Sequence, residues 1–192
     1  PVLVDKGTRW ETCAIIGRSN MKILGIIGGM SPESTATYYT EINRLVNQKK
    51  GGNISAPIVM VSVEFEEIVQ CQKQSEWQRA GEILAEAGKK LEMIGAEGIV
   101  LATNTMHKVA PQIERALSIP FLHILDATAD AIKSRGLNKV ALLGTKFTMS
   151  DNFYRDGLIV RGITPIVPNE DTQNEIHRII FDELCVGKFL PT

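Results

Sequence analysis

Residues 97–108 hold the side chains of this chain that are best placed to do chemistry. The apolar run 99–102 is typical of a buried strand and delivers several polar side chains in succession, namely Thr103, Asn104, Thr105 and His107. Small hydrogen-bonding residues between a strand's carboxyl end and a helix N-terminus occupy the place where open α/β sheets bind ligands, often anions. Capping a helix needs only one such residue. The run therefore favours a site for a small anionic molecule.

A second strand-to-helix turn lies near the start of the sequence. Gly28 and Gly29 permit a tight turn with close backbone approach, and Met30 follows them. Ser31 is suited to cap the next helix and Pro32 to occupy its first position. The exposed N–H groups there favour a carboxylate or phosphate. An ordinary capped turn is the alternative, and the glycine spacing matches neither the dinucleotide fingerprint nor the P-loop.

A third turn repeats the same arrangement. Gly144 follows an apolar run, and the hydroxyl residues Thr145, Thr148 and Ser150 come at the expected start of a helix. Capping alone would explain Thr148 or Ser150. Because similar turns that open from parallel strands meet at one edge of a sheet, the three turns together favour a shared binding site more than any one alone.

The composition limits the classes of function. The chain has 192 residues, of which 44% are hydrophobic and 22% charged, and its formal net charge is −1. These values are typical of a soluble protein with one or two α/β domains. They give no sign of nucleic-acid binding, and no apolar run reaches the ~18 residues of a membrane span. The three cysteines and three histidines show neither disulfide nor metal-ligand spacing, which favours a reducing cytoplasm and predicts no metal site.

Apolar periodicity predicts strands that alternate with helices along the chain. The expected strands are 22–28, 57–63, 98–102, 121–124, 139–143 and 163–167. The expected helices are 32–48, 76–94, 104–117, 126–134, 150–158 and 171–186. This alternation predicts an α/β fold with mainly parallel sheets and right-handed crossovers.

The breaks in this pattern divide the chain into three expected parts. Residues 1–20 lack periodicity and are interpreted as an upstream extension or cloning remnant, with a real N-terminal arm as the alternative. Residues 21–118 are expected to form a first α/β domain, which ends where a Ser-Ile-Pro segment interrupts the pattern of strands and helices. Residues 119–192 are expected to form a second α/β domain. This domain is expected to be truncated, because only a few residues follow its last helix.

Other reactive side chains are expected to play structural roles. Cys71 lies in a polar segment and is expected to be inert, since a lone cysteine is rarely catalytic. Cys185, on the last helix, is expected to pack against its neighbours. His123 is expected to be a hydrogen-bonded core residue inside a strand, and His177 to be solvated.

The three turns, in this order, resemble those of the aspartate/glutamate racemase superfamily, and the similarity covers about residues 21–189. The sequence is most similar to the cofactor-independent amino-acid racemases that act on aspartate and glutamate, some of them with broad specificity. The resemblance implies two pseudo-symmetric, open parallel-sheet (Rossmann-like) domains with the active site between them. It also implies racemisation without pyridoxal phosphate or any other cofactor, an amino-acid substrate, and a homodimer.

The resemblance also assigns roles to particular residues. In the family, two opposed acid/base groups, usually cysteines, flank the substrate Cα, and here Thr103 stands in the position of the first. Asn104 and Thr105 would hold the substrate carboxylate. The other substrate-binding residues it implies are Met30, Ser31, Thr145 and Thr148. The supporting residues it implies are Gly28, Gly29 and His107.

In members of the family, the second acid/base group is in a Gly-Cys-Thr-Glu motif, on a strand that follows the last helix predicted here. This sequence lacks that motif. The resemblance therefore implies amino-acid racemisation that is impaired in this chain. Two alternatives stay open. The chain could be a non-catalytic protein that binds dicarboxylates or amino acids, or an inactive gene fragment.

Overall fold

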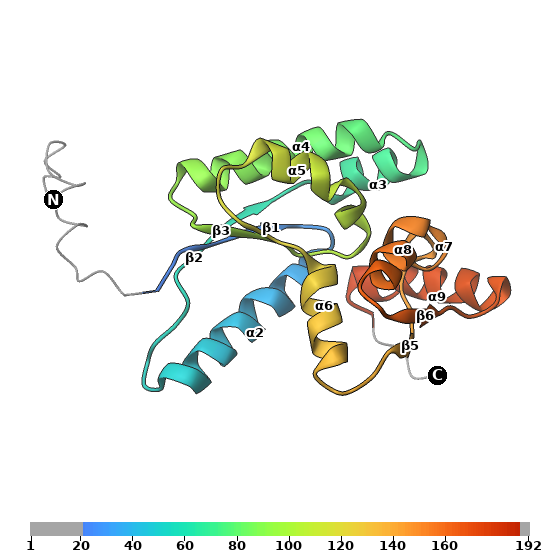
Figure 1. Cartoon of the computed structure of the whole chain (residues 1–192). Coiled ribbons are helices and arrows are strands. Elements are labelled where there is room, and N and C mark those ends of the chain that lie inside the picture. The colour runs from blue at the N-terminus through green and yellow to red at the C-terminus, as the bar shows by residue number, and fades with distance from the viewer. Residues whose placement is uncertain (1–20, 189–192) are drawn as a thin grey trace, which may run out of the picture.

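A four-stranded parallel sheet forms the centre of the larger half of the structure (Figure 1). The structure is a computed structural model that describes residues 21–188. The strands are β1 (Leu24–Gly28), β2 (Ile58–Ser62), β3 (Gly98–Leu101) and β4 (Phe121–Leu122), in the order β2-β1-β3-β4. Ile26 and Ile27 of β1 are fully buried, as expected for a central strand covered on both faces.

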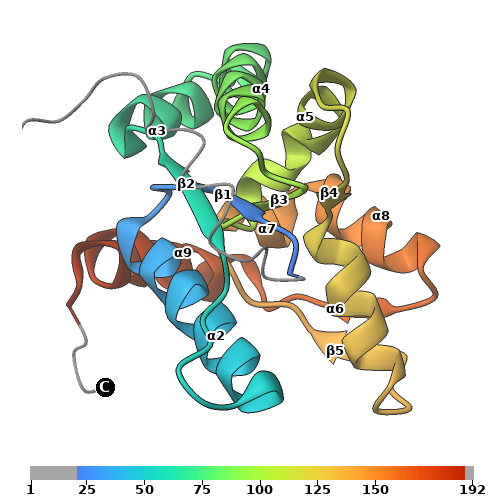
Figure 2. The same cartoon turned by 90° about the vertical axis from the view of Figure 1, so that its left-hand side faces the viewer.

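Helices cover both faces of this sheet (Figures 1 and 2). One face carries α3 (Phe65–Lys73), α4 (Trp77–Met93) and α5 (Ala110–Ala116), and the other carries α2 (Pro32–Lys50) and α6 (Ile124–Lys133). The main hydrophobic core lies beneath α3, α4 and α5. Its largest fully buried side chains include Ile68, Leu84, Leu91, Ile99 and Ile113.

A smaller parallel sheet, β5 (Lys139–Ala141) and β6 (Thr164–Ile166), lies in the second half of the chain. The helices around it are α7 (Lys146–Ser150), α8 (Asn152–Val160), α9 (Glu170–Asp182) and the 3-10 turn η2 (Leu184–Val186). A separate buried cluster belongs to this half and consists of Leu125, Ala129, Leu142, Tyr154, Leu158 and Ile163.

The structure confirms the predicted alternation of strands and helices but corrects several boundaries. The predicted helix 104–117 begins as a 3-10 turn, η1 (Thr105–Val109), and becomes α-helical only at Ala110. Pro111 lies in the first turn of α5, where its missing N–H is tolerated. The predicted helix 150–158 corresponds to α8, which begins at Asn152 because the Asp151 side chain accepts from the Phe153 N–H and caps it. A separate short helix, α7, precedes it and was not predicted.

Helix α3 was not predicted, because its segment is short and mostly polar and so lacks a clear apolar periodicity. Cys71 lies on this helix and is buried, contrary to its interpretation as part of a polar segment. His123 is not inside a strand. It caps α6, where its Nδ1 accepts from the Leu125 N–H at 3.1 Å. His177 is half-buried, and its Nδ1 accepts from the Lys146 N–H at 3.1 Å.

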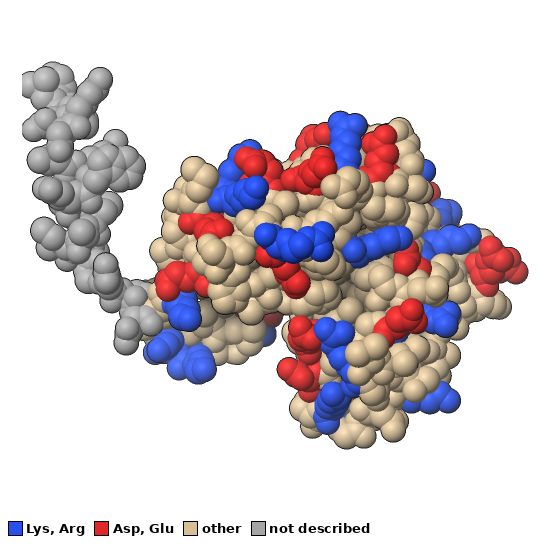
Figure 3. All heavy atoms as spheres, turned by 45° about the horizontal axis from the view of Figure 1, so that its top comes forward, with Lys and Arg blue, Asp and Glu red and all other residues tan. Residues whose placement is uncertain are grey.

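The first sheet continues past residue 118, because β4 pairs with β3 through Phe121 and Leu122. The division of the chain into domains at that residue stays a prediction. The expected extension at residues 1–20 lies outside the described residues. No helix within residues 21–188 is long and apolar enough to cross a membrane. On the face shown in Figure 3, cationic and anionic side chains are interspersed.

The turn after β1 depends on glycine, and we expect Gly29→Ala to lower the free energy of unfolding by ~2–4 kcal/mol. Gly29 has a φ of +96°, and an added Cβ would lie 2.3 Å from the Val63 carbonyl oxygen. Gly51 also has a positive φ, +78°, but an added Cβ there meets nothing within 4 Å. Gly51→Ala should therefore cost only ~1 kcal/mol. Urea unfolding measures both, and equal losses would contradict the close approach.

Candidate functional site

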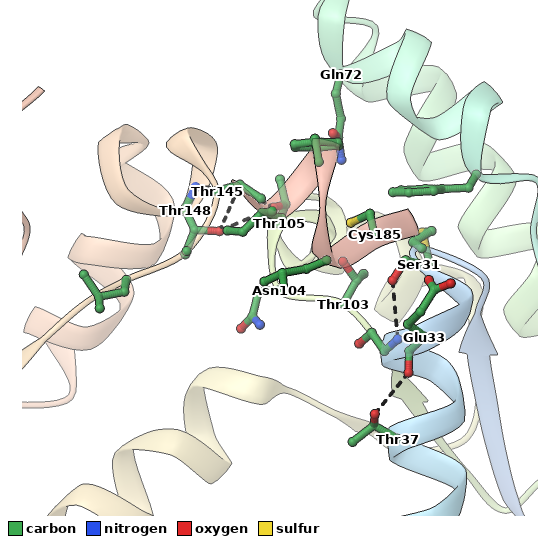
Figure 4. Close-up of a pocket in the computed structure, with 18 of the residues that line it drawn as sticks. Ser31, Glu33, Thr37, Gln72, Thr103, Asn104, Thr105, Thr145, Thr148 and Cys185 are labelled. Carbon is green, nitrogen blue, oxygen red and sulfur yellow. Dashed lines mark hydrogen bonds between the residues drawn. The ribbon is translucent and has the colours of Figure 1, made fainter. Parts of the chain in front are cut away.

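The three predicted turns line one cavity of about 380 Å³. The turns follow β1, β3 and β5, and Figure 4 shows side chains from all three around the cavity, among them Ser31, Thr103 and Thr145. The predicted contact residues that line it are Met30, Ser31, Thr103, Asn104, Thr105, Thr145 and Thr148. The predicted supporting residues Gly28, Gly29 and His107 are not among the lining residues.

Hydrogen bonds hold the first turn against the start of α2. Ser31 caps this helix, and its Oγ accepts from the Ser34 N–H at 3.4 Å. The Thr35 hydroxyl accepts from the Gly29 N–H at 2.8 Å and donates to the Ser31 carbonyl at 2.9 Å. A Cβ added at Gly28 would lie 2.4 Å from the Thr35 Cγ2, so glycine is required there too. The N-terminus of α2 is thereby presented to the cavity in a fixed position.

His107 fixes the turn that carries Thr103. Its Nε2 accepts from the Ile124 N–H at 3.3 Å, so the proton lies on Nδ1, which donates to the Thr103 carbonyl at 2.8 Å. The ring is only 2% exposed. Burial, and then the nearby His123, lower the pKa of His107 from 6.5 to about 4. A neutral imidazole therefore ties the backbone of Thr103 to the start of α6.

Three threonine hydroxyls form a closed cluster on one wall of the cavity (Figure 4). The Thr105 Oγ1 lies 2.9 Å from the Thr145 Oγ1 and 3.3 Å from the Thr148 Oγ1. The Thr145 and Thr148 oxygens lie 3.2 Å apart, and Thr145 also caps α7. Each hydroxyl can both donate and accept. The cluster joins the turn after β3 to the turn after β5 and can turn donors toward an anion.

Sequence reasoning missed Tyr154, which lies on α8 and is 4% exposed. Its hydroxyl donates to the Asn104 Oδ1 at 3.2 Å. Because the amide oxygen is occupied in this way, the amide N–H₂ of Asn104 is left to donate to a ligand. No motif in the sequence marks Tyr154, since its partner is 50 residues away in the chain.

Cys185 also lines the cavity, although it was expected only to pack on the last helix. Burial raises the pKa of its thiol, and the hydrogen bond with Ser31 partly opposes that change. Gln72 of α3 was missed as well. It is 7% exposed and lines the cavity, and its Nε2 donates to the Met106 Sδ at 3.0 Å. Within residues 21–188, no group of three or more His, Cys, Asp or Glu residues could hold a metal ion.

The sequence matches the family described as Asp/Glu/Hydantoin racemase over residues 27–189. It is also similar to the broad-specificity amino-acid racemase RacX of Bacillus subtilis (strain 168). The two are 25% identical over 160 residues, which cover 82% of this chain and 69% of that protein.

Solved structures share the fold. A candidate Asp/Glu racemase from Yersinia pestis matches with a TM-score of 0.81 and 50% identity, over 88% of this chain and 74% of that one. An aspartate racemase homologue from Pyrococcus horikoshii OT3 matches with a TM-score of 0.74 and 40% identity, over the same shares of the two chains. These similarities confirm the predicted parallel α/β fold.

The buried neutral state of His107 predicts how stability depends on pH. The unfolded chain binds a proton at His107 near pH 6.5, whereas the folded chain binds it only near pH 4. The free energy of unfolding should therefore fall as the pH drops from 7 to 4, by ~3 kcal/mol from this group. His123 and His177 act in the same direction, because burial also lowers their pKa values.

The variant His107→Asn isolates this contribution. Urea unfolding should show the variant to be less stable than the wild type at pH 7, with a gap that shrinks toward pH 4. A gap of the same size at both pH values would mean that His107 is not held neutral by the fold.

Proposed function

The chain belongs to the Asp/Glu/hydantoin racemase family, and from this premise we propose that it catalyses racemisation at the Cα of an amino acid of the aspartate/glutamate class. The observation that carries the proposal is the meeting of three strand-end turns at one cavity of about 380 Å³. The cavity is large enough for such an amino acid. It offers hydroxyls, an amide and a helix N-terminus to the carboxylate of the substrate.

The substrate carboxylate is bound, in this proposal, by Asn104 and Thr105 together with N–H groups at the start of α2. The bond from Tyr154 supports this role, because it leaves the amide N–H₂ of Asn104 free to donate. The contacts of Thr105 with Thr145 and Thr148 support it too, because they hold the hydroxyls in place before the substrate arrives. Such preorganised donors stabilise negative charge as it develops on the carboxylate while the Cα proton leaves.

Thr103 is the acid/base group on one face of Cα in this proposal. A two-base reaction also needs a second group on the opposite face, so that one group removes the proton and the other delivers one. The Gly-Cys-Thr-Glu motif that carries this second group in the family is missing from these 192 residues, so in this proposal the racemisation by this chain is impaired. A threonine hydroxyl is a far weaker acid than a thiol, so at neutral pH it donates or relays a proton better than it accepts one. The bond from His107 to the Thr103 carbonyl supports this role, because it fixes the turn that aims the hydroxyl.

The same weak acidity favours one alternative function, a protein that binds dicarboxylic amino acids without turning them over. The donors around the cavity would serve binding equally well. The two functions differ in a single measurable event, the exchange of the Cα proton with solvent.

Exchange at Cα tests the proposed function. The wild-type protein should remove the α-deuterium from labelled aspartate or glutamate and form the opposite enantiomer slowly, because the second acid/base motif is missing; NMR and chiral chromatography follow the two events. Thr103→Ala should slow both events about 100-fold or more. Thr40→Ala, an exposed hydroxyl on α2 outside the cavity, is the control and should leave them unchanged.

Tight binding of glutamate by the wild type with no exchange would replace racemisation with the binding function. Turnover that survives Thr103→Ala would remove Thr103 from its assigned role.

Tyr154→Phe should raise the KM for the amino acid up to about tenfold while changing kcat less, because the Asn104 amide is then free to rotate. Steady-state kinetics measure this effect, with exposed Tyr39→Phe as the control. Adding Tyr154→Phe to Asn104→Ala should have no further effect on KM, because the two residues act together. If the increase in KM of the double variant equals the product of the increases in the two single variants, Tyr154 acts independently of Asn104.

A further inference from the structure

Glu33 stands out among the described residues that line the cavity, because it is the only one of them with a carboxylate, and no Lys, Arg or His of that part of the chain lines the cavity beside it. It lies in the first turn of α2, two residues after the capping Ser31. Figure 4 shows its carboxylate on the side of the cavity where Ser31 and Cys185 lie. No lysine or arginine is found among the lining residues of the described segment 21–188.

The carboxylate of Glu33 forms no ion pair or hydrogen bond with any other group in residues 21–188. The hydroxyls nearest to it in the helix bond elsewhere. Ser34 donates to the Ala102 carbonyl at 3.3 Å, and Thr37 donates to the backbone carbonyl of Glu33 at 3.0 Å. The fold therefore brings an anionic group to the cavity and leaves it available for a ligand.

An acidic residue in the first turn also stabilises the helix dipole. Glu66 is a first-turn acidic residue of α3 in the same way, and it does not line the cavity. The dipole explains why glutamate is favoured at this position of the helix. It does not require the carboxylate to face a cavity, and the two roles can be separated by experiment.

The chemistry of the proposed reaction supplies a partner. An α-amino acid at neutral pH carries an ammonium group beside its carboxylate, and an anion close to the ammonium favours its charged form. A charged ammonium withdraws electrons from Cα and makes the Cα proton more acidic than a neutral amine would. If the carboxylate is held by Asn104 and Thr105, the ammonium still needs an acceptor.

We propose that the Glu33 carboxylate binds the ammonium group of the substrate and thereby selects α-amino acids over the corresponding hydroxy acids. The inference rests on the proposed function, since it concerns the same cavity and substrate. It assigns Glu33 a role that depends on its charge and on the nitrogen of the ligand. A hydroxy acid of the same shape lacks that nitrogen.

The test compares L-glutamate with 2-hydroxyglutarate, in which a hydroxyl replaces the ammonium. Glu33→Gln should raise the KM for glutamate about tenfold, because a contact between charged groups is lost. The inhibition constant of 2-hydroxyglutarate should change by less than about twofold, because its contacts are kept. Glu66→Gln removes a helix-terminal charge outside the cavity and should change neither constant.

Equal shifts of the two constants in Glu33→Gln, or no shift in either, would overturn the assignment. If the wild type does not racemise glutamate, the proposed function fails by itself, and calorimetric binding of the same two ligands still tests Glu33. A loss of glutamate affinity at constant hydroxyglutarate affinity then supports the ammonium site, whereas parallel losses contradict it.

Discussion

Parallel pairing of β1 with β3 is the constraint on which the site depends. The register joins Leu24 to Gly98 and Ile27 to Leu101, so both strands end at the same edge of the sheet. The Ala102 N–H continues the ladder to the Ile27 carbonyl at 2.9 Å, and the Ser34 hydroxyl donates to the Ala102 carbonyl. The turn that begins α2 and the turn that carries Thr103 are therefore neighbours because of backbone geometry, whatever ligand they bind.

The second half of the structure completes the cavity through neutral polar contacts. Thr145 and Thr148 meet Thr105, and Tyr154 meets Asn104, so two elements around the smaller sheet reach the turn after β3. Neutral hydroxyl and amide groups are less costly to bury than charges and can reorient their hydrogen atoms toward an anion. The charge of Glu33 lies on the opposite side of this arrangement, which suits a ligand with charges of both signs.

The sequence allowed the alternating elements and the lining turns to be predicted, because each turn is encoded locally by an apolar run, a glycine or hydroxyl group, and a helix start. Helix α3 and the 3-10 start at Thr105 could not be predicted in this way, since short polar helices have weak periodicity. Tyr154 and Glu33 were missed for different reasons. The contact of Tyr154 spans 50 residues, whereas Glu33 is indistinguishable in the sequence from an ordinary first-turn carboxylate.

If three turns that are distant in sequence bind one substrate molecule, all three must respond when that molecule binds. Titration of the ¹⁵N-labelled protein with L-glutamate measures this response. Amide signals of Ser31, Asn104 and Thr145 should shift together along one saturating curve, while those of Gly52 and Asn53, in the groove beside α2, should stay in place. Shifts confined to a single turn, or shifts at Gly52 and Asn53 without the others, would contradict a shared site.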